Sequence, residues 1–415
     1  MAEIAYQCST CSKRYPRDEV RYLCPDCAKA YRPGMPLVGV LTAVFDYGKI
    51  RRSFRKRAPD WNLFSAVDRK FFPAYAMPPT PFFRCARLGS AFGLEDVWIK
   101  NDGLNPSGSL KDRASFLLVA EANRLGEDTL VTASTGNAAS ALAAVCAAAG
   151  KRAVIFVPEA APKAKLVQML LCGATVVPVR GTYDDAFRMS LEYTARHGGL
   201  NRNTAYHPLT IEGKKTAGLE IWLQNGFAVP SIIVIPTGDG VILAGVHKAF
   251  LDLRAAGLIR RLPRLICVQA EKSCAIHQYF SSGTYRNAPN PVTIADSISV
   301  SVPSNAHLAR EAIVQSRGFS LVVSDSEIIR GQRLLASTAG VFAEPAAAAA
   351  VAALGKLASS GKLKPNERVV VLITGHGLKD IDAAMKAVRI PASVSPSPAG
   401  LALAARRIAA EGGPS

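Results

Sequence analysis

Four short stretches of this chain combine residue types that could act together on a ligand. They are residues 105–113 (NPSGSLKDR), 134–137 (STGN), 237–240 (TGDG) and 374–377 (TGHG). Three of them stand between a strand-like run and a helix-like run, where hydroxyls and backbone N–H groups bind anions well. The first also carries a lysine, which can react with a carbonyl group. Together the stretches predict one pocket for an anionic cofactor that carries an aldehyde.

Lys111 is the candidate nucleophile. The run 97–100 (VWIK) reads as a buried strand, a polar loop follows, and a helix is expected from Leu110. Ser109 is the expected N-cap, and Asp112 completes a capping-box pattern three residues later. Lys111 then lies in the first turn, where the helix dipole disfavours an ammonium and leaves an amine that can form a Schiff base. A lone lysine is usually solvated, so this assignment depends on the other three stretches.

The other three stretches are candidate anion-binding turns. Residues 134–136 precede a helix expected over residues 137–149, and their N–H groups suit a carboxylate. Residues 237–241 follow an apolar run, and two glycines let the backbone close around a phosphate. Thr374 follows another buried run, at the sheet edge where open α/β folds bind ligands. A dinucleotide-binding loop is the alternative for 237–241, but Gly245 comes five residues after Gly240, which breaks the G-x-G-x-x-G spacing.

These stretches belong to a set of phrases that resembles the fold-type-II family of pyridoxal-phosphate enzymes, and most closely the threonine synthases. The phrases are residues 105–113, 133–139 (ASTGNAA), 211–216 (IEGKKT), 295–298 (ADSI), 340–346 (GVFAEPA) and 374–380 (TGHGLKD). They follow the family's order between about residue 78 and residue 390. The resemblance implies that pyridoxal 5'-phosphate is the cofactor.

The resemblance also implies a role for each residue. Lys111 would hold the cofactor aldehyde and later move protons, and Asn137 would hydrogen-bond the cofactor's 3-oxygen. Thr374 would contact the pyridine nitrogen, and since a hydroxyl does not hold this nitrogen protonated, elimination and replacement are favoured over transamination. The cofactor phosphate would bind at Thr237, Gly238, Asp239, Gly240 and Val241. The substrate would bind at Ser134, Thr135, Gly136, His207 and Thr210.

Two features depart from the threonine synthase pattern. The family commonly has Asn-Pro-Tyr-Arg where this chain has HPLT, so His207 replaces the asparagine and Thr210 the arginine. A bidentate guanidinium–phosphate contact is therefore missing at Thr210. Asp239 is the second departure, because an acid repels a phosphate, and its side chain is expected to point away. Four nearby lysines offer positive charge, and each is expected at the solvated surface: Lys163, Lys165, Lys214 and Lys215.

Three functions are compatible with these residues. The first is threonine synthase, which converts O-phospho-L-homoserine and water to L-threonine and phosphate. The second is a β-eliminating or β-replacing enzyme that acts on serine, threonine or an O-activated amino acid, which Thr210 favours. The third is a non-catalytic or nucleic-acid-associated module, against which the intact Lys111, Asn137 and Thr374 argue. In the first two cases the partner is a small anionic amino acid.

The N-terminal region carries a separate metal-binding pattern. Cys8 and Cys11 form one C-x-x-C knuckle, and Cys24 and Cys27 form another after twelve intervening residues. Four thiolates suit tetrahedral zinc and leave no open coordination position, so a structural zinc ribbon is expected. Free thiols and a redox C-x-x-C pair are the alternatives. The remaining cysteines, which lie mostly in apolar runs, are expected to be small buried side chains: Cys85, Cys146, Cys172, Cys267 and Cys274.

The elements that must position these residues alternate between strand-like and helix-like runs from about residue 96 to 390. This alternation predicts an α/β fold with two doubly wound parallel-sheet domains, preceded by the zinc ribbon. The expected units are 1–35 for the ribbon, 36–95 with 212–390 for a large cofactor-binding domain, 96–211 for a smaller domain with the lysine and the carboxylate turn, and 391–415 for a flexible tail with a short helix near 401–410.

The composition suits a cytoplasmic enzyme. The 415 residues are 49% hydrophobic, enough for two catalytic domains and a small module, and nine cysteines fit a reducing compartment. No apolar run is long enough to span a bilayer, and no signal-peptide pattern is present. The net charge is +18, with six basic residues in 49–57. Because that run lacks interleaved aromatic residues beyond Phe54, nucleic-acid binding is not expected. The family resemblance suggests a homodimer.

Overall fold

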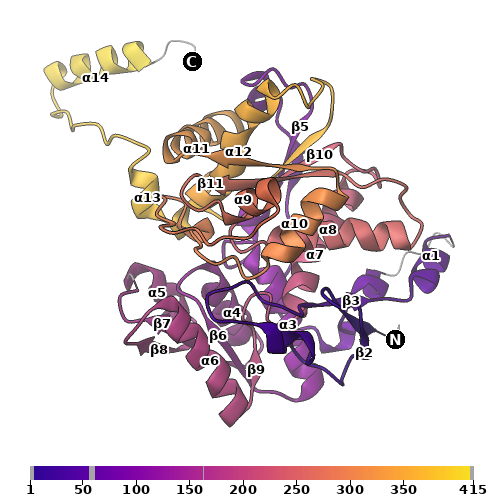
Figure 1. Ribbon diagram of the computed structural model, residues 1–415. Helices are drawn as coiled ribbons and strands as arrows, with labels where there is room; N and C mark the ends of the chain where they lie inside the picture. The colour runs from indigo at the N-terminus through magenta and orange to yellow at the C-terminus, as the bar shows by residue number, and fades with distance from the viewer. Residues whose placement is uncertain (1–3, 56–60, 162, 412–415) are drawn as a thin grey trace.

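The computed structural model describes residues 4–55, 61–161 and 163–411, which form three sheets and the helices around them (Figure 1). An antiparallel sheet of order β2-β1-β3 contains β1 (Ala5–Cys8), β2 (Arg14–Pro16) and β3 (Leu41–Val44). A six-stranded sheet of order β12-β11-β10-β13-β5-β4 contains β4 (Phe82–Arg84), β5 (Val97–Asn101), β10 (Ile232–Pro236), β11 (Arg264–Ala270), β12 (Phe319–Val323) and β13 (Val369–Ile373). A four-stranded parallel sheet of order β8-β7-β6-β9 contains β6 (Thr129–Ala133), β7 (Arg152–Pro158), β8 (Thr175–Val179) and β9 (Leu200–Asn201).

The α-helices of the described residues surround these sheets. They are α1 (Tyr47–Arg55), α2 (Ala86–Ser90), α3 (Lys111–Leu125), α4 (Asn137–Ala148), α5 (Lys163–Leu171), α6 (Tyr183–His197), α7 (Leu209–Gln224), α8 (Val241–Ala255), α9 (Ala275–Ser282), α10 (Ala306–Gln315), α11 (Asp325–Ala339), α12 (Pro345–Ser359), α13 (Ile381–Met385) and α14 (Pro398–Glu411). Short 3-10 helices cover Cys27–Ala30, Trp61–Phe64, Arg69–Phe71, Asp102–Leu104, Asp296–Ile298 and Gly377–Lys379. Local chemistry fixes several ends: Thr182 and Ser324 cap α6 and α11 through capping boxes, and Gly126 ends α3 with a φ of 70°.

The central strands of the six-stranded sheet are buried on both faces. Every residue of β10 (IIVIP) and of β13 (VVVLI) is buried, as expected of parallel strands covered by helices on both sides. Ile233 and Ile235 belong to the core that includes Leu243 and other α8 side chains. Ile232 and Val234 face the other way and pack with the alanines of α12. The expected α/β fold with parallel sheets is therefore confirmed.

One strand lies in a different sheet from the one expected. Residues 97–101 were assigned to the smaller unit, whereas β5 pairs in parallel with β13 in the six-stranded sheet, Val97 opposite Val369. Alternation along the chain indicates a strand but not the sheet that it joins, because pairing depends on contacts far apart in sequence. The division into domains itself remains a prediction.

The N-terminal sheet packs on the starts of α7 and α8. Tyr22 stacks on Tyr206 with ring centroids 4.6 Å apart, and its hydroxyl accepts the Asn201 N–H at 3.0 Å. Leu37 and Val40 share a buried cluster with residues from those two helices and from the segment before α7: Ala205, Ile211 and Val241. The cysteine-bearing module is therefore in contact with segments that carry predicted site residues.

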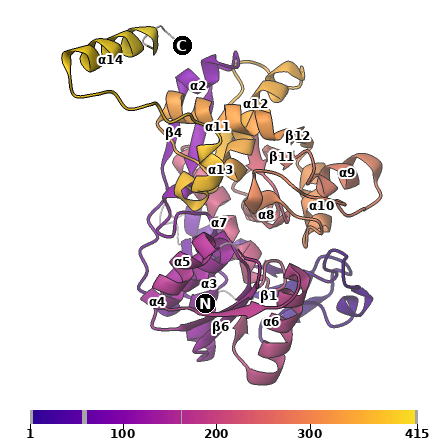
Figure 2. The same cartoon turned by 90° about the vertical axis from the view of Figure 1, so that its left-hand side faces the viewer.

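The C-terminal helix stands away from the body. Figures 1 and 2, which differ by a quarter turn, both show α14 separated from the rest of the chain. It confirms the expected short helix near 401–410. At the other end, α1 exposes Lys49, Arg51 and Arg52 of the basic run, whereas Lys56 and Arg57 lie outside the described residues. Within the described ranges, every helix is too short or too polar to cross a bilayer.

Candidate active site

A pocket opens where the carboxyl ends of β10 and β13 meet the first residues of α3 and α4. Its lining comes from all four predicted stretches and from two further segments: Lys111, Asn137, Pro236, Thr237, Gly238, Asp239, Gly240, Ile242, Ser297, Ile298, Glu344, Ala346 and Thr374. Val241 begins α8 directly beside this lining. Segments separated by as many as 263 positions along the chain, from Lys111 to Thr374, thus meet at one sheet edge.

Lys111 is held at its place by the neighbouring strand β13. The Leu110 N–H donates to the Thr374 carbonyl at 2.9 Å, and Ser109 forms a β-bridge with Gly375. The backbone around the lysine is thus hydrogen-bonded to the backbone around Thr374. These backbone contacts fix the spacing between Lys111 and Thr374.

The expected capping box at the start of α3 is wrong. The helix begins at Lys111 with Leu110 as its N-cap, and the Ser109 hydroxyl accepts the Lys111 N–H at a long 3.4 Å. Asp112 instead accepts the Ser107 N–H at 2.7 Å and the Tyr75 hydroxyl at 3.1 Å, and it also contacts the Ser107 hydroxyl. The buried Asp112 carboxylate therefore stabilises the polar loop before the helix through Ser107 and does not cap the helix.

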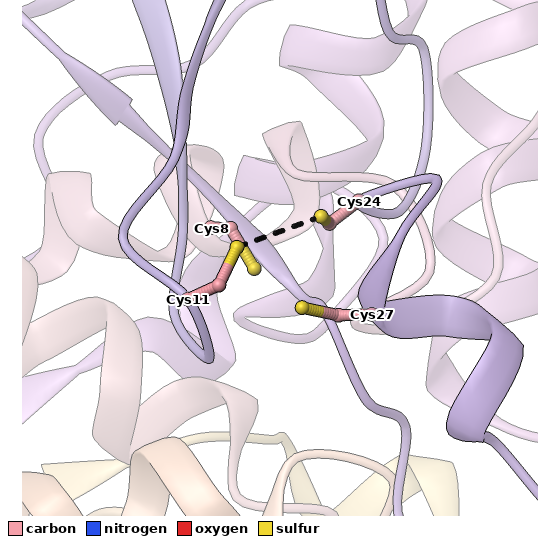
Figure 3. Close-up of side chains that lie close together, drawn as sticks. All are labelled: Cys8, Cys11, Cys24 and Cys27. Atoms are coloured by element: carbon pink, nitrogen blue, oxygen red, sulfur yellow. Dashed lines mark hydrogen bonds between the residues drawn. The ribbon is translucent and has the colours of Figure 1, made fainter.

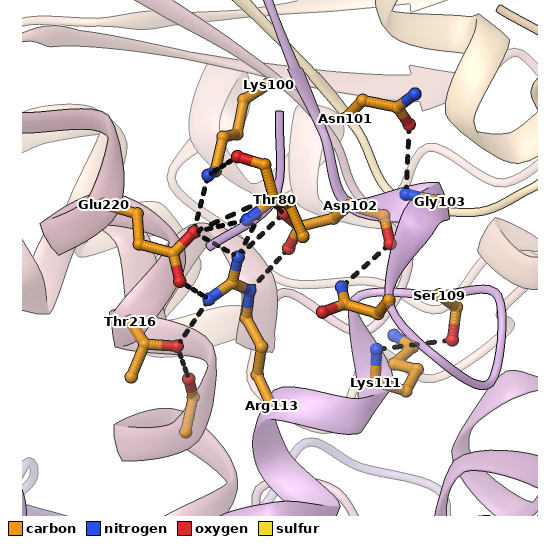
Figure 4. Close-up of polar contacts among 12 residues, drawn as sticks. Thr80, Lys100, Asn101, Asp102, Gly103, Ser109, Lys111, Arg113, Thr216 and Glu220 are labelled. Atoms are coloured by element: carbon orange, nitrogen blue, oxygen red, sulfur yellow. Dashed lines mark hydrogen bonds and ion pairs between the residues drawn. The ribbon is translucent and has the colours of Figure 1, made fainter. Parts of the chain in front are cut away.

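Arg113, two residues after Lys111, ties the start of α3 to neighbouring segments through ion pairs (Figure 4). Its guanidinium donates to Asp102 at 2.6 Å and to Glu220 of α7 at 2.6 Å. Lys100 of β5 also donates to Glu220 at 2.6 Å. Burial alone would raise the pKa of Glu220, but the charges of Arg113 and Lys100 lower it to about 2. The ion pairs join β5, the 3-10 helix that follows it, and α7 to the first turn of α3.

We predict that Arg113→Met destabilises the protein by about 3–5 kcal/mol, because it leaves the buried Asp102 carboxylate without its cation and leaves Glu220 with Lys100 alone. Urea unfolding of the purified variant measures this loss. Arg188→Met is the matched control, since Arg188 also pairs with two acids, Asp185 and Glu192, but is 63% exposed. The control is expected to lose no more than about 1 kcal/mol. Equal losses in the two variants would contradict the anchoring role.

We also predict a specific acid sensitivity. The folded pKa of Glu220 lies below its ordinary value, so its contribution is present above pH 4.5 and is lost as the pH falls toward 2. The expected loss is about 3 kcal/mol over this window. Unfolding free energies measured between pH 5 and 2 should fall less steeply in Glu220→Gln than in the wild-type protein. Parallel curves would exclude this group as a source of the acid sensitivity.

The turn at residues 237–241 has the geometry of a phosphate-binding loop. Gly240 has a φ of 87°, and a Cβ there would lie 2.8 Å from the Ala309 Cβ. A Cβ at Gly238 would lie 3.0 Å from the Ile298 Cα. Only glycine therefore allows this turn to pack as it does. No acceptor for the N–H groups of Gly238, Asp239 or Gly240 is found among the described residues, so these amides are available to an anion.

Asp239 does not point away from this turn as expected. Its carboxylate accepts the Val241 N–H at 2.9 Å and lines the pocket. Burial raises its pKa, but the charges of Lys214 and Lys111 together with the Val241 N–H lower it overall. The N-terminus of α8 thus attracts the carboxylate that the sequence places beside it.

The carboxylate turn lies at the carboxyl end of β6. The Ser134 N–H donates to the Phe156 carbonyl at 3.2 Å, and the Ser134 hydroxyl accepts the Gly136 N–H at 3.2 Å. Ser134, Thr135 and Gly136 are half-buried and directly precede Asn137, the first residue of α4. They border the pocket without belonging to its lining, so their substrate contacts remain predictions.

The pocket lining contains one acid, Glu344, and one hydroxyl, Ser297, that are not among the predicted site residues. Glu344 accepts from the Asn137 amide at 3.0 Å and from the Ser297 hydroxyl at 3.2 Å. Burial raises the pKa of Glu344, although these two donors and nearby lysines oppose the shift. Both residues lie in phrases that carry the family resemblance. One sequence feature could have indicated Glu344: it directly precedes Pro345, and a proline of this kind is typical of the first position of a helix.

The structure does not bring His207 or Thr210 into the pocket lining. The Thr210 hydroxyl donates to the His207 carbonyl at 2.7 Å and accepts the Ala205 N–H at 3.1 Å. His207 Nδ1 accepts the Leu209 N–H at 3.1 Å, and burial lowers the pKa of His207 to about 3. Both side chains are buried, and both form hydrogen bonds within their own turn. Each is shorter than the arginine that the family commonly has at the position of Thr210. Their role as substrate ligands remains a prediction.

Four cysteines of the N-terminal module converge (Figure 3). The Sγ atoms of Cys8, Cys11, Cys24 and Cys27 all lie within 4.8 Å of one another. One pair comes from the turn between β1 and β2, the other from the start of the Cys27–Ala30 helix. Of the other five cysteines, Cys85, Cys146 and Cys267 are buried as expected, whereas Cys172 and Cys274 are only half-buried. The convergent set has the donor type and number of a structural zinc site.

Comparisons with known proteins show the family of this chain. The family model described as pyridoxal-phosphate dependent enzyme matches residues 74–375. The threonine synthase of Methanocaldococcus jannaschii is 34% identical over 94% of this chain and 96% of its own length. The threonine synthase of Methanosarcina acetivorans is 35% identical over 90% of this chain and 92% of its own. A solved structure of threonine deaminase isoform 2 from Solanum lycopersicum superimposes with a TM-score of 0.66 at 21% identity, covering 78% of this chain and 91% of that one, which shows the fold alone.

The match of the family model therefore covers both the lysine-bearing stretch and the turn at residues 237–241, and it extends through β13 to Thr374. The similarity to the two threonine synthases covers 94% and 90% of the chain. By this combination, the chain belongs to the pyridoxal-phosphate dependent enzymes and, within that family, to the threonine synthase-like members.

Proposed function

We propose that this protein is a pyridoxal-phosphate dependent threonine synthase that converts O-phospho-L-homoserine and water to L-threonine and phosphate. The observation that carries the proposal is 34% to 35% identity to two threonine synthases over 90% or more of the chain. The site supports it, since Lys111, Asn137 and Thr374 line one pocket with the glycine turn.

The residues present fit the cofactor. The turn at 237–241 offers free N–H groups at the N-terminus of α8, which suit a phosphate group. Lys111 and Thr374 line the same pocket, and their backbones are hydrogen-bonded through Leu110. When bound, pyridoxal phosphate supplies an electron sink for charge that develops on the substrate carbons.

The chain's own side chains would position the substrate and transfer its protons. Lys111 would hold the cofactor aldehyde and, once displaced by substrate, carry protons between carbon atoms with its amine. Residues 134–136 would hold the α-carboxylate at the N-terminus of α4. Asn137 would hydrogen-bond the ring oxygen, with Glu344 fixing its amide. The Thr374 hydroxyl would meet the ring nitrogen without keeping it protonated, which directs the chemistry toward elimination and replacement.

Phosphate release from O-phospho-L-homoserine, followed by amino-acid analysis, tests the proposal. The cofactor-loaded protein is expected to release phosphate and threonine in equal amounts. Bound cofactor that responds spectrally to other amino acids, with no release of phosphate, would reject this function.

A second candidate is a β-eliminating or β-replacing enzyme acting on serine, threonine or an O-activated amino acid. The observation that favours it is the absence of an arginine at Thr210, together with the inward burial of Thr210 and His207. Ammonia and a keto acid formed from serine or threonine, in the absence of threonine synthesis, would identify this activity.

We infer that the four convergent cysteines bind one structural zinc ion. Support comes from their mutual approach within 4.8 Å and from the absence of any other ligand type in the set, which suits closed tetrahedral coordination. Free thiols or a redox pair would not need four sulfurs at one point. The packing of Tyr22 on Tyr206 gives the ribbon a structural link to the segment before α7.

We further infer a homodimer that works in the cytoplasm. The family resemblance supports the dimer, and nine cysteines in a single chain support a reducing compartment. Light scattering during size-exclusion chromatography decides the oligomeric state, and cell fractionation decides the location.

A further inference from the structure

Two buried cations near the pocket lack the partners that buried charges need. Arg202 and Lys214 are both fully buried. Among the described residues, no hydrogen-bond acceptor is found for the Lys214 Nζ or for one terminal nitrogen of Arg202. Unpaired buried charges are strongly unfavourable. Lys215, the next residue along α7, shows the usual solution, because it pairs with Glu212 at 2.6 Å and Asp252 at 3.0 Å.

Lys214 lies between the two helices whose first turns bound the pocket. Gly213 packs so closely on α3 that a Cβ there would lie 2.4 Å from the Arg113 carbonyl oxygen. On the other side, a Cβ at Gly245 of α8 would lie 2.9 Å from the Lys214 Cβ. Residues 213–214 are therefore wedged between the helix that begins with Lys111 and the helix that begins after the phosphate-binding turn.

Arg202 reaches the same helix from the four-stranded sheet. It follows β9, and its Nε contacts the Ser115 hydroxyl at 3.4 Å while Nη1 contacts the Thr204 hydroxyl at 3.2 Å. Ser115 lies four residues after Lys111, so the two share one face of α3. The guanidinium thus lies one helical turn from the reactive lysine, with Nη2 still free for an acceptor.

The acids around these cations do not balance them. The Asp239 carboxylate attracts the Lys214 ammonium, and the Asp239 and Asp112 carboxylates attract the Arg202 guanidinium. Asp112 already accepts hydrogen bonds from Ser107 and Tyr75. Burial lowers the pKa of Lys214 well below its ordinary value and that of Arg202 to about 10, which shows how incompletely they are compensated. The Lys214 Nζ and the Arg202 Nη2 therefore remain available to an anionic ligand.

We propose that Arg202 and Lys214 form the subsite for the substrate's phosphate group, in place of the arginine that related enzymes have at the position of Thr210. This inference rests on the proposed function. The cofactor also carries a phosphate, and the shared chemistry is a phosphoryl dianion. The substrate is the assigned source, because the free N–H groups at 238–240 already provide a site for the cofactor phosphate.

The test uses Lys214→Gln and Arg202→Gln in the cofactor-loaded protein. Cofactor absorbance reports the binding of O-phospho-L-homoserine and of L-homoserine, which lacks only the phosphate. We expect roughly 10- to 100-fold weaker binding of the phosphorylated ligand, as for a lost charged hydrogen bond, and less than about a 2-fold change for L-homoserine. Lys163→Gln, an exposed lysine of α5, is the control and should leave both affinities unchanged. Arg202→Lys should recover part of the loss.

Three results would overturn the subsite. One is an equal loss for both ligands, and another is unchanged binding of both in folded variants. The third is weaker retention of pyridoxal phosphate, measured by dialysis, with unchanged discrimination between the ligands, which would assign the cations to the cofactor. If a glutamine variant does not fold, the binding of O-phospho-L-homoserine and of L-homoserine is compared in Lys214→Met and Arg202→Lys instead. Selective phosphate-dependent binding by a wild-type protein that makes no threonine would support the subsite and reject the proposed function separately.

Discussion

Replacing Lys111 with alanine is expected to remove the covalent link to the cofactor and to lower turnover by at least about 10³-fold. The amine is the one lysine in the lining of the pocket, as far as the described residues show, and it stands at the first residue of α3. Borohydride reduction of the loaded protein, followed by peptide mass analysis, should place a reduced pyridoxyl group on the peptide that contains Lys111. In Lys111→Ala this label should be absent.

The effect should be local to the reactive amine. Gly238, Gly240 and Thr374 are unchanged in the variant, so non-covalent cofactor binding is expected to persist, with lower affinity, in equilibrium dialysis. Lys163→Ala, at an exposed lysine, should retain both label and turnover. A label that survives on another lysine in Lys111→Ala, together with turnover, would remove Lys111 from its assigned role.

The double substitution Cys8→Ser and Cys24→Ser is expected to abolish stoichiometric zinc, because two of the four ligands are lost from two different knuckles. The N-terminal sheet should then open at a lower temperature than the α/β body, since its cysteines hold its turns together. Metal analysis measures the first effect, and hydrogen exchange of residues 5–44 measures the second. The cofactor absorbance should be retained, because no cysteine of the cluster lines the pocket.

A matched double variant tests whether the position of the cysteines matters. Cys172→Ser and Cys274→Ser removes two half-buried thiols outside the cluster and should leave one zinc per chain. Stoichiometric zinc in Cys8→Ser with Cys24→Ser would show that the metal binds elsewhere. Protection of the segment 203–210 should fall modestly in the cluster variant, since Tyr22 packs on Tyr206 there.

The interpretations that hold from the sequence are those in which a local pattern has a local physical cause. The runs of β10 and β13 predict buried parallel strands, because every position is apolar. The glycine at position 240 predicts a tight turn, and the structure gives Gly240 a φ of 87°, which is costly for other residues. The two knuckles predict convergent thiols, since each C-x-x-C turn brings its own pair together.

The fate of the charged side chains could not be predicted in this way. Lys214 and Lys215 were expected at the solvated surface, and both are fully buried, one beside the pocket and one paired with Asp252. Lys165 pairs with Asp296, whereas Lys163 is exposed as expected. Lys165 and Asp296 lie 131 positions apart in sequence, and Lys215 and Asp252 lie 37 apart, so the packing of distant segments decides which lysines are desolvated.

The sequence by itself therefore determined the α/β class, the turns that precede α4 and α8, the lysine at a helix start and the four-cysteine cluster. Each of these follows from residues within a few positions of one another. The tertiary structure decided that Glu344 and Ser297 line the pocket and that His207 and Thr210 do not. It also left the Lys214 Nζ and the Arg202 Nη2 buried without an acceptor among the described residues. The reason is that burial and pairing are properties of distant segments in contact, and a local pattern carries no information on what will pack against it.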